Sequence, residues 1–145
     1  MEVKARLAAV NDAEQLSELN RQFNGGDRRP VDEVAASIAA GDEVIAVAET
    51  DGQVVGFGCA QSFRSFCYRE LLGEITELYV AESHRRKGVA SAILACLEEQ
   101  LKHRGVTEVK VLTGSDNATA IRTYERCGYV RDDELLLKKE LSQDT

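Results

Sequence analysis

The apolar positions along the chain change their spacing several times, and each change marks the boundary of a predicted element. Alternating apolar and polar residues, or short β-branched and aromatic runs, predict strands, whereas apolar residues three or four apart predict helices. The predicted strands cover residues 3–10, 43–49, 53–61, 74–80 and 108–112, with a closing hairpin at 129–130 and 135–141. The predicted helices follow residue 12 and cover residues 31–40, 89–104 and 117–126. The pattern therefore predicts an α/β protein.

Turn residues support several of these boundaries. Asn11 and Asp12 are expected to cap the first helix, and Asp51-Gly52 between two apolar runs predicts a β-hairpin. Residues 74–80, 89–104 and 108–112 form a strand, a helix and a strand, the order of a right-handed βαβ unit. Ligands of such units bind at the carboxyl ends of the strands, so this stretch is the first candidate for a functional site.

The turn inside this unit reads Arg-Arg-Lys-Gly-Val-Ala over residues 85–90. A helix N-terminus exposes unpaired N–H groups that attract phosphate, and Gly88 lets the backbone approach an anion closely. Solvated surface cations are the simpler interpretation. Cations at a helix N-terminus oppose the helix dipole, however, so three in succession favour an anionic ligand. The spacing matches neither a Walker loop nor a dinucleotide-binding fingerprint.

The turn Arg85-x-x-Gly88-x-Ala90 resembles the acyl-CoA pyrophosphate loop of the GNAT family of N-acetyltransferases, whose pattern is [QR]-x-x-G-x-[GA]. A second stretch similar to that family runs over residues 117–129, and the resemblance is clear from about residue 43 to residue 131. It implies an α/β (α+β) fold with a mixed, mostly antiparallel central sheet and helices on both faces. The strands of the central βαβ unit are then expected to splay apart and admit acyl-CoA.

The resemblance also assigns roles to individual residues. It implies that Tyr124 is the general acid for the departing thiolate, that a backbone N–H near Leu78 stabilises the oxyanion, and that Asn117 contacts the pantetheine arm. Tyr79 and Val80 are expected to hydrogen-bond pantetheine through their main chains. The full expected acetyl-CoA-binding set is Leu78, Tyr79, Val80, Arg85, Arg86, Lys87, Gly88, Val89, Ala90, Asn117 and Tyr124.

An amine acceptor must lose a proton before it attacks, so a base is useful. Glu74 and Glu77 are the candidate bases. Side chains alternate along a strand, so we expect the two carboxylates to point to opposite faces and only one to reach the cleft. Glu74 matches the catalytic glutamate of the histone-acetylating branch of the family and is slightly preferred. An ordinary strand carboxylate is the competing interpretation for each.

Composition narrows the class of protein further. The chain has 145 residues, which suits one domain over residues 1–145, and a formal net charge of −7 argues against a nucleic-acid partner. No apolar run approaches the length of a membrane span, and the first residues lack the apolar core of a signal peptide, so a cytoplasmic location is expected. The four cysteines have no C-x-x-C spacing, which favours reduced thiols over a disulfide or metal site.

The function expected from these observations is N-acetyl transfer from acetyl-CoA to a primary amine, without a metal. An aminoglycoside, a polyamine, an amino acid or a protein N-terminus remains open as acceptor, as does a homodimer. The resemblance implies an acceptor pocket walled by the first two helices, the loop between them at residues 24–29 and the loop before the fourth strand at residues 63–72. Asp27, Tyr68 and Glu70 could contact a cationic amine there. A non-catalytic acyl-CoA sensor or scaffold module is the alternative, and Tyr124 is the residue that discriminates between them.

Overall fold

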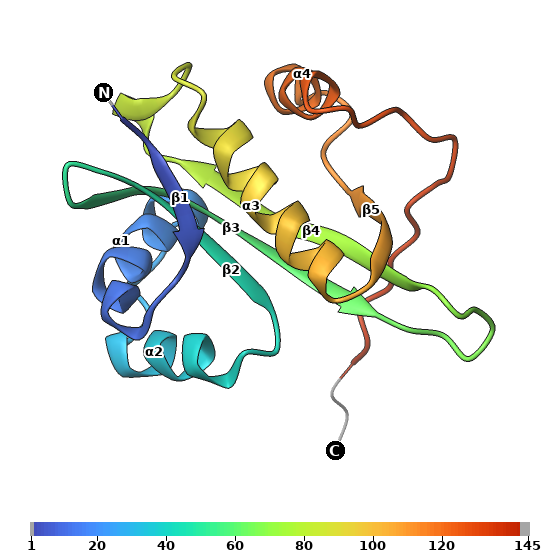
Figure 1. Ribbon diagram of the computed structural model, residues 1–145, viewed down its shortest axis with the longest axis horizontal. Coiled ribbons are helices and arrows are strands. Elements are labelled where there is room, and N and C mark those ends of the chain that lie inside the picture. The colour runs from blue at the N-terminus through green and yellow to red at the C-terminus, as the bar shows by residue number, and fades with distance from the viewer. Residues whose placement is uncertain (1, 143–145) are drawn as a thin grey trace.

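A computed structural model describes residues 2–142 (Figure 1). In chain order its elements are β1 (Lys4–Leu7), η1 (Val10–Asp12), α1 (Ala13–Asn24), α2 (Val31–Ala40), β2 (Val44–Thr50), β3 (Gln53–Phe63), β4 (Leu71–Val80), η2 (Glu82–His84), α3 (Val89–His103), β5 (Val106–Val111) and α4 (Ala118–Arg126). Every helix and strand predicted up to residue 126 is present.

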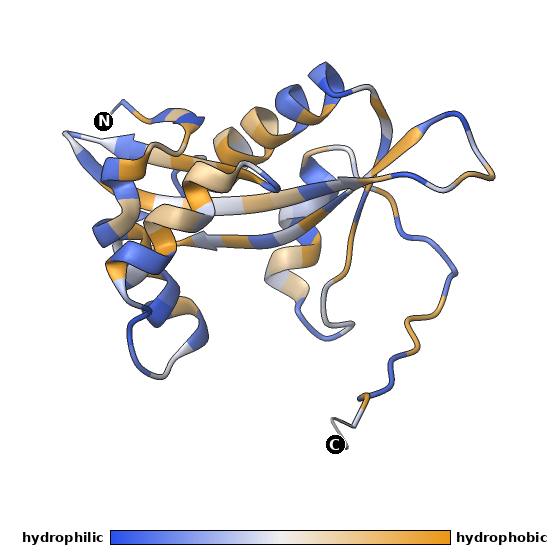
Figure 2. Cartoon of the chain, turned by 90° about the horizontal axis from the view of Figure 1, so that it is seen from below, coloured by the Kyte–Doolittle hydropathy of each residue, from blue (hydrophilic) through white to orange (hydrophobic). Residues whose placement is uncertain are grey.

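The five strands form one sheet in the order β1-β2-β3-β4-β5. Only the β4–β5 pair is parallel, because α3 carries the chain back across the sheet between these strands. Seen edge-on in Figure 2, the sheet has α3 on one face and α1 with α2 on the other. The mixed, mostly antiparallel sheet with helices on both faces is therefore confirmed.

The α3 face of the sheet contains the larger hydrophobic core. Ile93, Leu97 and Leu101 of α3 are fully buried against the strands. Two glycines of β3 let the helix approach closely, because a Cβ added at Gly58 would meet Ile93 at 2.7 Å and one at Gly56 would meet the Tyr79 carbonyl at 2.9 Å. A side chain at Gly58 would push α3 away from β3, and one at Gly56 would also collide with the backbone of β4.

The opposite face is covered by α1 through Leu16 and Leu19, which pack on β2 and β3. An aromatic cluster extends this core towards the end of β4. Phe23 of α1 stacks on Tyr79 of β4 with ring centroids 5.2 Å apart, and Phe57 of β3 lies edge-on to Phe23 at 6.1 Å. This cluster ties α1 to the end of β4.

Two local predictions are wrong. Asp12 occupies the N-cap position of α1, but its side chain forms no capping hydrogen bond to that helix. Its carboxylate instead accepts hydrogen bonds from the Ala9 N–H at 2.7 Å and from the Arg6 guanidinium at 2.8 and 3.0 Å. The closing hairpin is also wrong, since residues 129–130 and 135–141 form no strand in the described part of the chain. A strand requires a partner edge, and after α4 the chain runs away from the sheet (Figures 1 and 2).

Among the helices of residues 2–142, none has the length and apolar character needed to cross a membrane.

Candidate functional site

The parallel strands β4 and β5 separate near the middle of β4. Their ladder runs from Leu71 opposite Val106 to Ile75 opposite Val111, where β5 ends. β4 continues for five more residues to Val80, paired only with β3 on its other side among the described residues. The predicted splay is therefore present, and it leaves main-chain groups of residues 76–80 facing an opening.

A β-bulge at Thr76 decides which side chains reach this opening. Cys59 of β3 pairs with Glu77 and Ala60 pairs with Ile75, so one residue of β4 is skipped. The extra residue reverses the alternation after it, which puts Glu77 on the same face of the sheet as Glu74. The expectation that the two glutamates point to opposite faces is therefore wrong. Both lie on the face that carries α1 and α2.

The bulge also sets the direction of the main-chain groups. The Ala81 N–H donates to the Val55 carbonyl at 2.8 Å, so Ala81 points towards β3. Along an antiparallel pair, the main-chain N–H and C=O groups of every second residue point to the same side, so those of Tyr79 also point towards β3. The main-chain groups of Leu78 and Val80 point into the opening. The structure thus places the Leu78 N–H where the oxyanion donor was expected. It does not place the Tyr79 main chain there, because that residue pairs with Phe57.

Glu77 lies in a partly desolvated, acidic environment. Burial raises the pKa of its carboxyl, and the neighbouring charge of Glu43 raises this pKa further. Both carboxylates also act on Cys59, whose thiol pKa is raised chiefly by burial. Glu74 differs, since it stands 3.7 Å from the ammonium of Lys110 on β5. Glu77 is the better candidate base, and the slight preference for Glu74 is not supported by this geometry.

Tyr124 of α4 borders the opening from the α3 face. Its side chain is only 9% exposed and its ring packs edge-on against Tyr129 at 5.7 Å. Burial raises the pKa of the phenol, and the charge of Glu77 raises it further. Because its pKa is raised, the phenol stays protonated at neutral pH. Within residues 2–142 its hydroxyl forms no hydrogen bond, so it can donate to a ligand.

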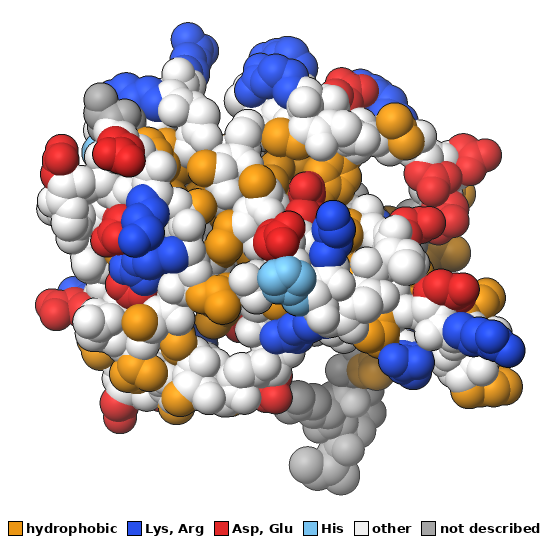
Figure 3. Space-filling model, in the orientation of Figure 1, with side chains coloured by type: hydrophobic (Ala, Val, Ile, Leu, Met, Phe, Trp, Pro, Cys, Tyr) orange, Lys and Arg blue, Asp and Glu red, His pale blue; other side chains and the backbone are white. Residues whose placement is uncertain are grey.

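The basic turn connects β4 to α3 on the same rim of the molecule. The Gly88 backbone is left-handed at φ 79°, and no side chain caps the first turn of α3. The first N–H bonded within this turn is that of Ala92, which donates to the Gly88 carbonyl at 3.1 Å. The N–H groups of residues 89–91 are thus available to an anion. Lys and Arg side chains line this rim over the turn and over α4 (Figure 3). The Lys87 ammonium donates to the Ser83 carbonyl at 3.4 Å.

Two of the predicted binding residues have structural roles in this fold. Arg85 donates from Nε to the Val80 carbonyl at 2.9 Å, and its guanidinium lies 5.5 Å from the centre of the Tyr79 ring. It holds the turn against the end of β4, while Arg85, Arg86 and Lys87 all remain exposed. Asn117 caps α4, since its carboxamide oxygen accepts from the Ala120 N–H at 3.1 Å.

The two loops expected to wall the acceptor pocket lie apart, whereas α2, another of its expected walls, does line a cavity. Residues 24–29 lie beside α1 and α2, whereas residues 64–70 form the tip of the β3–β4 hairpin at the far end of the molecule (Figures 1 and 2). Asp27, Tyr68 and Glu70 therefore do not meet. A cavity of about 400 Å³ lies instead on the α2 face, lined by Ala36, Ser37, Ala40, Asp42, Glu43 and Gln61.

Sequence reasoning missed Glu43 and Gln61, which line this cavity. Glu43 precedes β2 and lies far along the chain from the basic turn and from residues 117–129. Gln61 belongs to β3 and pairs with Glu74 of β4. An acidic residue beside a strand resembles any other surface carboxylate in a sequence, so only the fold reveals its position. All four cysteines are free thiols. No group of His, Cys, Asp and Glu side chains within residues 2–142 is arranged to hold a metal ion.

Several solved structures of similar fold are those of acetyltransferases. An aminoglycoside acetyltransferase from an uncultured soil metagenomic sample aligns with a TM-score of 0.84 and 23% identity, over 98% of this chain and all of that one. Aminoglycoside N-acetyltransferase AAC(6')-Iy, solved with a CoA bisubstrate analogue, aligns with a TM-score of 0.82 and 18% identity, over 98% and 100% of the two chains. A ribosomal-protein-alanine N-acetyltransferase from Brucella melitensis aligns at 0.79 and 18%, over 97% and 100%.

The family model for the acetyltransferase (GNAT) family matches residues 13–129, which include the splayed strands, the basic turn, Glu77 and Tyr124. The match covers most of the chain and agrees with the fold and with the site described above. The chain therefore belongs to the GNAT family of acetyltransferases, whose fold binds acetyl-CoA.

Proposed function

We propose that this protein transfers the acetyl group of acetyl-CoA to a primary amine by direct attack within a ternary complex, with Glu77 as base and Tyr124 as acid. The observation that carries the proposal is the opening between β4 and β5. Around this opening lie the carboxyl of Glu77, whose pKa is raised, the protonated phenol of Tyr124 and the main-chain N–H groups of β4 that face the opening. They lie beside the N-terminus of α3, where no side-chain cap is found among residues 2–142.

The N-terminus of α3 fits the pyrophosphate of the donor. The N–H groups of residues 89–91 and the positive end of the helix dipole favour an anion, and the exposed cations of Arg86 and Lys87 stand beside them. Each charge-assisted hydrogen bond adds about 1.5–3 kcal/mol. This turn would hold the phosphates of acetyl-CoA, and the free edge of β4 would align the arm that follows.

The free edge of β4 also serves the acyl group. Acetyl-CoA supplies a thioester carbonyl whose oxygen gains negative charge when the amine attacks. The Leu78 N–H points into the opening and would donate to that oxygen. A main-chain donor on a paired strand is already fixed in direction, so it stabilises the developing charge without reorganisation.

Glu77 would remove a proton from the acceptor. An alkylammonium has a pKa near ~10.4, so only about one molecule in a few thousand is neutral at pH 7. Burial and the charge of Glu43 raise the pKa of Glu77, which makes its carboxylate a stronger base than an exposed one. It can therefore accept the proton directly or through a water molecule.

Tyr124 would protonate the departing sulfur. The phenol is protonated at neutral pH because burial and the charge of Glu77 raise its pKa. Its hydroxyl has no competing partner in the described part of the chain, and α4 holds it on the opposite side of the opening from Glu77. An acid and a base on opposite sides suit a reaction that gains a proton at one atom and loses one at another.

The cavity beside α2 would admit the amine. Asp42 and Glu43 contribute two carboxylates to its lining, and Gln61 adds a hydrogen-bonding side chain. Glu43 also acts electrostatically on Glu77, which places the cavity beside the proposed base. We infer that the acceptor is a cationic amine, a class to which the acceptors of the aminoglycoside acetyltransferases of similar fold also belong.

A thiol-release assay with acetyl-CoA and a panel of amines tests the reaction. The panel should contain an aminoglycoside, a polyamine, an amino acid and a peptide with a free N-terminus. We expect release to depend on one of these classes and to be lost in Tyr124→Phe. Tight acetyl-CoA binding without thiol release above background from any acceptor would instead support a non-catalytic sensor.

Calorimetry tests the phosphate site separately. We expect acetyl-CoA to bind more tightly than a pantetheine analogue that lacks the phosphates. Equal affinity for the two compounds would remove the role proposed for the basic turn, while leaving the assignment of Glu77 and Tyr124 intact.

A further inference from the structure

A second, smaller cavity lies at the corner of the sheet where β1 ends and β2 begins. Its volume is about 150 Å³, and we call it the corner cavity. Ile38 of α2 and Arg104, which follows α3, both line it, although the two helices cover opposite faces of the sheet (Figure 2). The cavity reaches both faces because β1 stops at Leu7, and beyond that point the edge of β2 has no partner strand in the described part of the chain.

The free edge of β2 presents a main-chain acceptor to this cavity. The Ala8 N–H donates to the Ile45 carbonyl at 2.9 Å, so the main-chain groups of Ile45 point towards β1. Those of Val44 point the other way, towards Ala60 of β3. The C=O and N–H of one peptide unit point in opposite directions, so the Glu43 carbonyl points past the end of β1. No group within residues 2–142 donates a hydrogen bond to this carbonyl.

Charged and apolar groups complete the lining of the corner cavity. Arg104 contributes a guanidinium at the end of α3, and Glu43 contributes a carboxylate before β2. No ion pair joins these two side chains in the part of the chain that the structure describes. Leu7, Ile38 and Val44 supply apolar walls. A few polar groups around a small apolar space are typical of a small-molecule site.

We propose that the corner cavity binds a small α-amino acid as its zwitterion, with the ligand carboxylate on Arg104 and the ligand ammonium on Glu43. A guanidinium binds a carboxylate through two parallel N–H donors. The ammonium would donate to the Glu43 carbonyl, and the Glu43 carboxylate would balance its charge. A cavity of about 150 Å³ admits roughly six non-hydrogen atoms, which is the size of alanine.

The two ends of the ligand are both needed in this arrangement. A simple carboxylic acid would leave the Glu43 carbonyl without a donor, and a simple amine would leave Arg104 without an acceptor. A polar group that is desolvated without a partner weakens binding. The corner cavity should therefore discriminate an amino acid from each of its two halves.

Occupation of the corner cavity would also affect the α2 cavity, because Glu43 lines both. An ammonium held at Glu43 places a positive charge beside the cavity proposed to admit a cationic amine, and like charges repel. The KM for the amine should rise about threefold. The KM for acetyl-CoA should not change, because the proposed phosphate site lies at the other end of α3. This consequence rests on the proposed function, whereas the binding itself does not.

Titrations followed by nuclear magnetic resonance test the binding and its place. L-alanine should shift the amide signals of Ala8, Gly41 and Glu43 in a saturable way and leave those of the β3–β4 hairpin unchanged. Propionate lacks the ammonium and ethylamine lacks the carboxylate. Each of these two compounds should bind at least about tenfold more weakly than L-alanine.

Two variants test the site from the side of the protein. Arg104→Gln should weaken L-alanine binding about tenfold, because the carboxamide cannot replace the paired N–H donors. Arg104 is exposed, so this variant should fold and keep its basal activity. Lys102→Gln is the matched control, since it removes a cation from the same helix end outside the cavity lining. Ala8→Leu would fill the cavity and should abolish binding, with the melting temperature as its folding control.

The thiol-release assay distinguishes an effector from a competitor. L-alanine should raise the KM for the amine in the parent and not in Arg104→Gln. A rise of equal size in both proteins would mean that L-alanine competes inside the α2 cavity, which contradicts the proposal.

Three binding results would overturn the proposal. A parent protein without saturable shifts in L-alanine has no such site. Equal affinity for L-alanine and propionate excludes recognition of the ammonium. Equal affinity of the parent and Arg104→Gln excludes the carboxylate contact. These titrations need no turnover, so they remain decisive even if the proposed acetyl transfer fails.

Discussion

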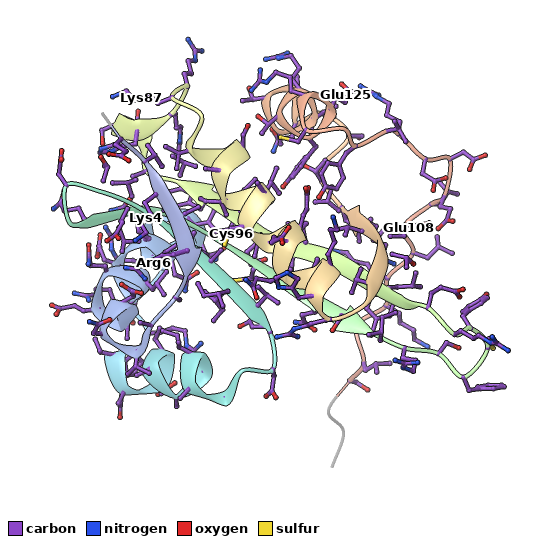
Figure 4. All side chains as sticks on the ribbon, in the orientation of Figure 1. Lys4, Arg6, Lys87, Cys96, Glu108 and Glu125 are labelled. Atoms are coloured by element: carbon purple, nitrogen blue, oxygen red, sulfur yellow. The ribbon has the colours of Figure 1, made fainter. Side chains whose placement is uncertain are left out.

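The two edges of the sheet are built in opposite ways. At the β1 edge, Arg6 bridges two carboxylates, lying 2.8 Å from Asp12 and 3.2 Å from Glu49, and so ties β1 to η1 and β2 (Figure 4). At the β5 edge the ladder stops at Ile75, and the chain after α4 leaves the sheet. The fixed edge makes a rigid scaffold, and the opening between β4 and β5 supplies the space into which acetyl-CoA is proposed to fit.

The difference follows from what each region must do. Asp12 is 4% exposed and its charge is matched by Arg6, which burial permits only in a well-fixed geometry. Around the β4–β5 opening, by contrast, Glu77 and Tyr124 have polar groups without partners of this kind. Stability is thus concentrated at one edge and chemistry at the other, a separation that substitutions can test.

The largest effect is expected from Tyr124→Phe at the open edge. Loss of the hydroxyl should lower kcat about 10²–10⁴-fold with little change in acetyl-CoA affinity, because Phe keeps the ring packing and removes only the proton donor. Steady-state kinetics measure the effect, and the melting temperature serves as control. A variant that turns over like the parent would show that water protonates the sulfur.

At the fixed edge we expect a change of similar size in free energy, but it should affect the free energy of unfolding and not the rate. Asp12→Ala leaves Arg6 without its closest partner and the Ala9 N–H without an acceptor, so the free energy of unfolding should fall by about 2–4 kcal/mol while kcat stays near the parent value. Glu18→Ala is the matched control, because Glu18 pairs with Arg21 on the exposed surface and should contribute little.

The same residue predicts a pH dependence of stability. The hydrogen bond from Arg6 is the main cause that lowers the pKa of Asp12 below its ordinary value of 3.8. The stabilisation is therefore complete above the unfolded pKa near 3.8 and is lost as the pH falls through the lower folded value. Denaturant titrations over this range should show a weaker acid dependence in Asp12→Ala than in the parent.

Glu77→Gln should lower kcat/KM about 10–100-fold at pH 7, and Glu74→Gln should lower it much less. Because burial raises the pKa of Glu77, the acidic limb of the parent profile should lie above the value of an ordinary glutamate, and activity should fall as the pH falls through it. The deficit of Glu77→Gln should shrink at high pH, where the amine loses its proton unaided. An unchanged acidic limb in both variants would mean that the proton leaves through water.

The smallest effect is expected from Gly88→Ala. A Cβ there meets nothing within 4 Å, so the cost arises from the left-handed φ of 79° and amounts to about 1 kcal/mol. The strain should displace the start of α3 and raise the KM for acetyl-CoA roughly 3–10-fold. Gly52→Ala is the control, since that glycine has a φ of 78° and equal space but lies in the β2–β3 turn. Equal KM values in the two variants would contradict the role of the turn.

The sequence by itself determined the helices and strands up to residue 126 and the basic turn that is proposed to bind phosphate. The periods of apolar residues are local properties, so the helices and strands up to residue 126 were predictable, as was the basic turn at the start of α3. The positions of Gly88 and Tyr124 within their elements also follow from spacing alone. These features depend on neighbours a few residues away, which a sequence displays directly.

Only the tertiary structure decided which face Glu77 occupies and what surrounds it. The bulge at Thr76 arises from the pairing of β4 with β3, and one skipped residue reverses every side chain beyond it. The neighbourhood of Glu77, Glu43 and the α2 cavity likewise depends on residues distant along the chain. The leucines after α4 have the pattern of a strand, but a strand forms only where another edge pairs with it, and within residues 2–142 this segment pairs with none.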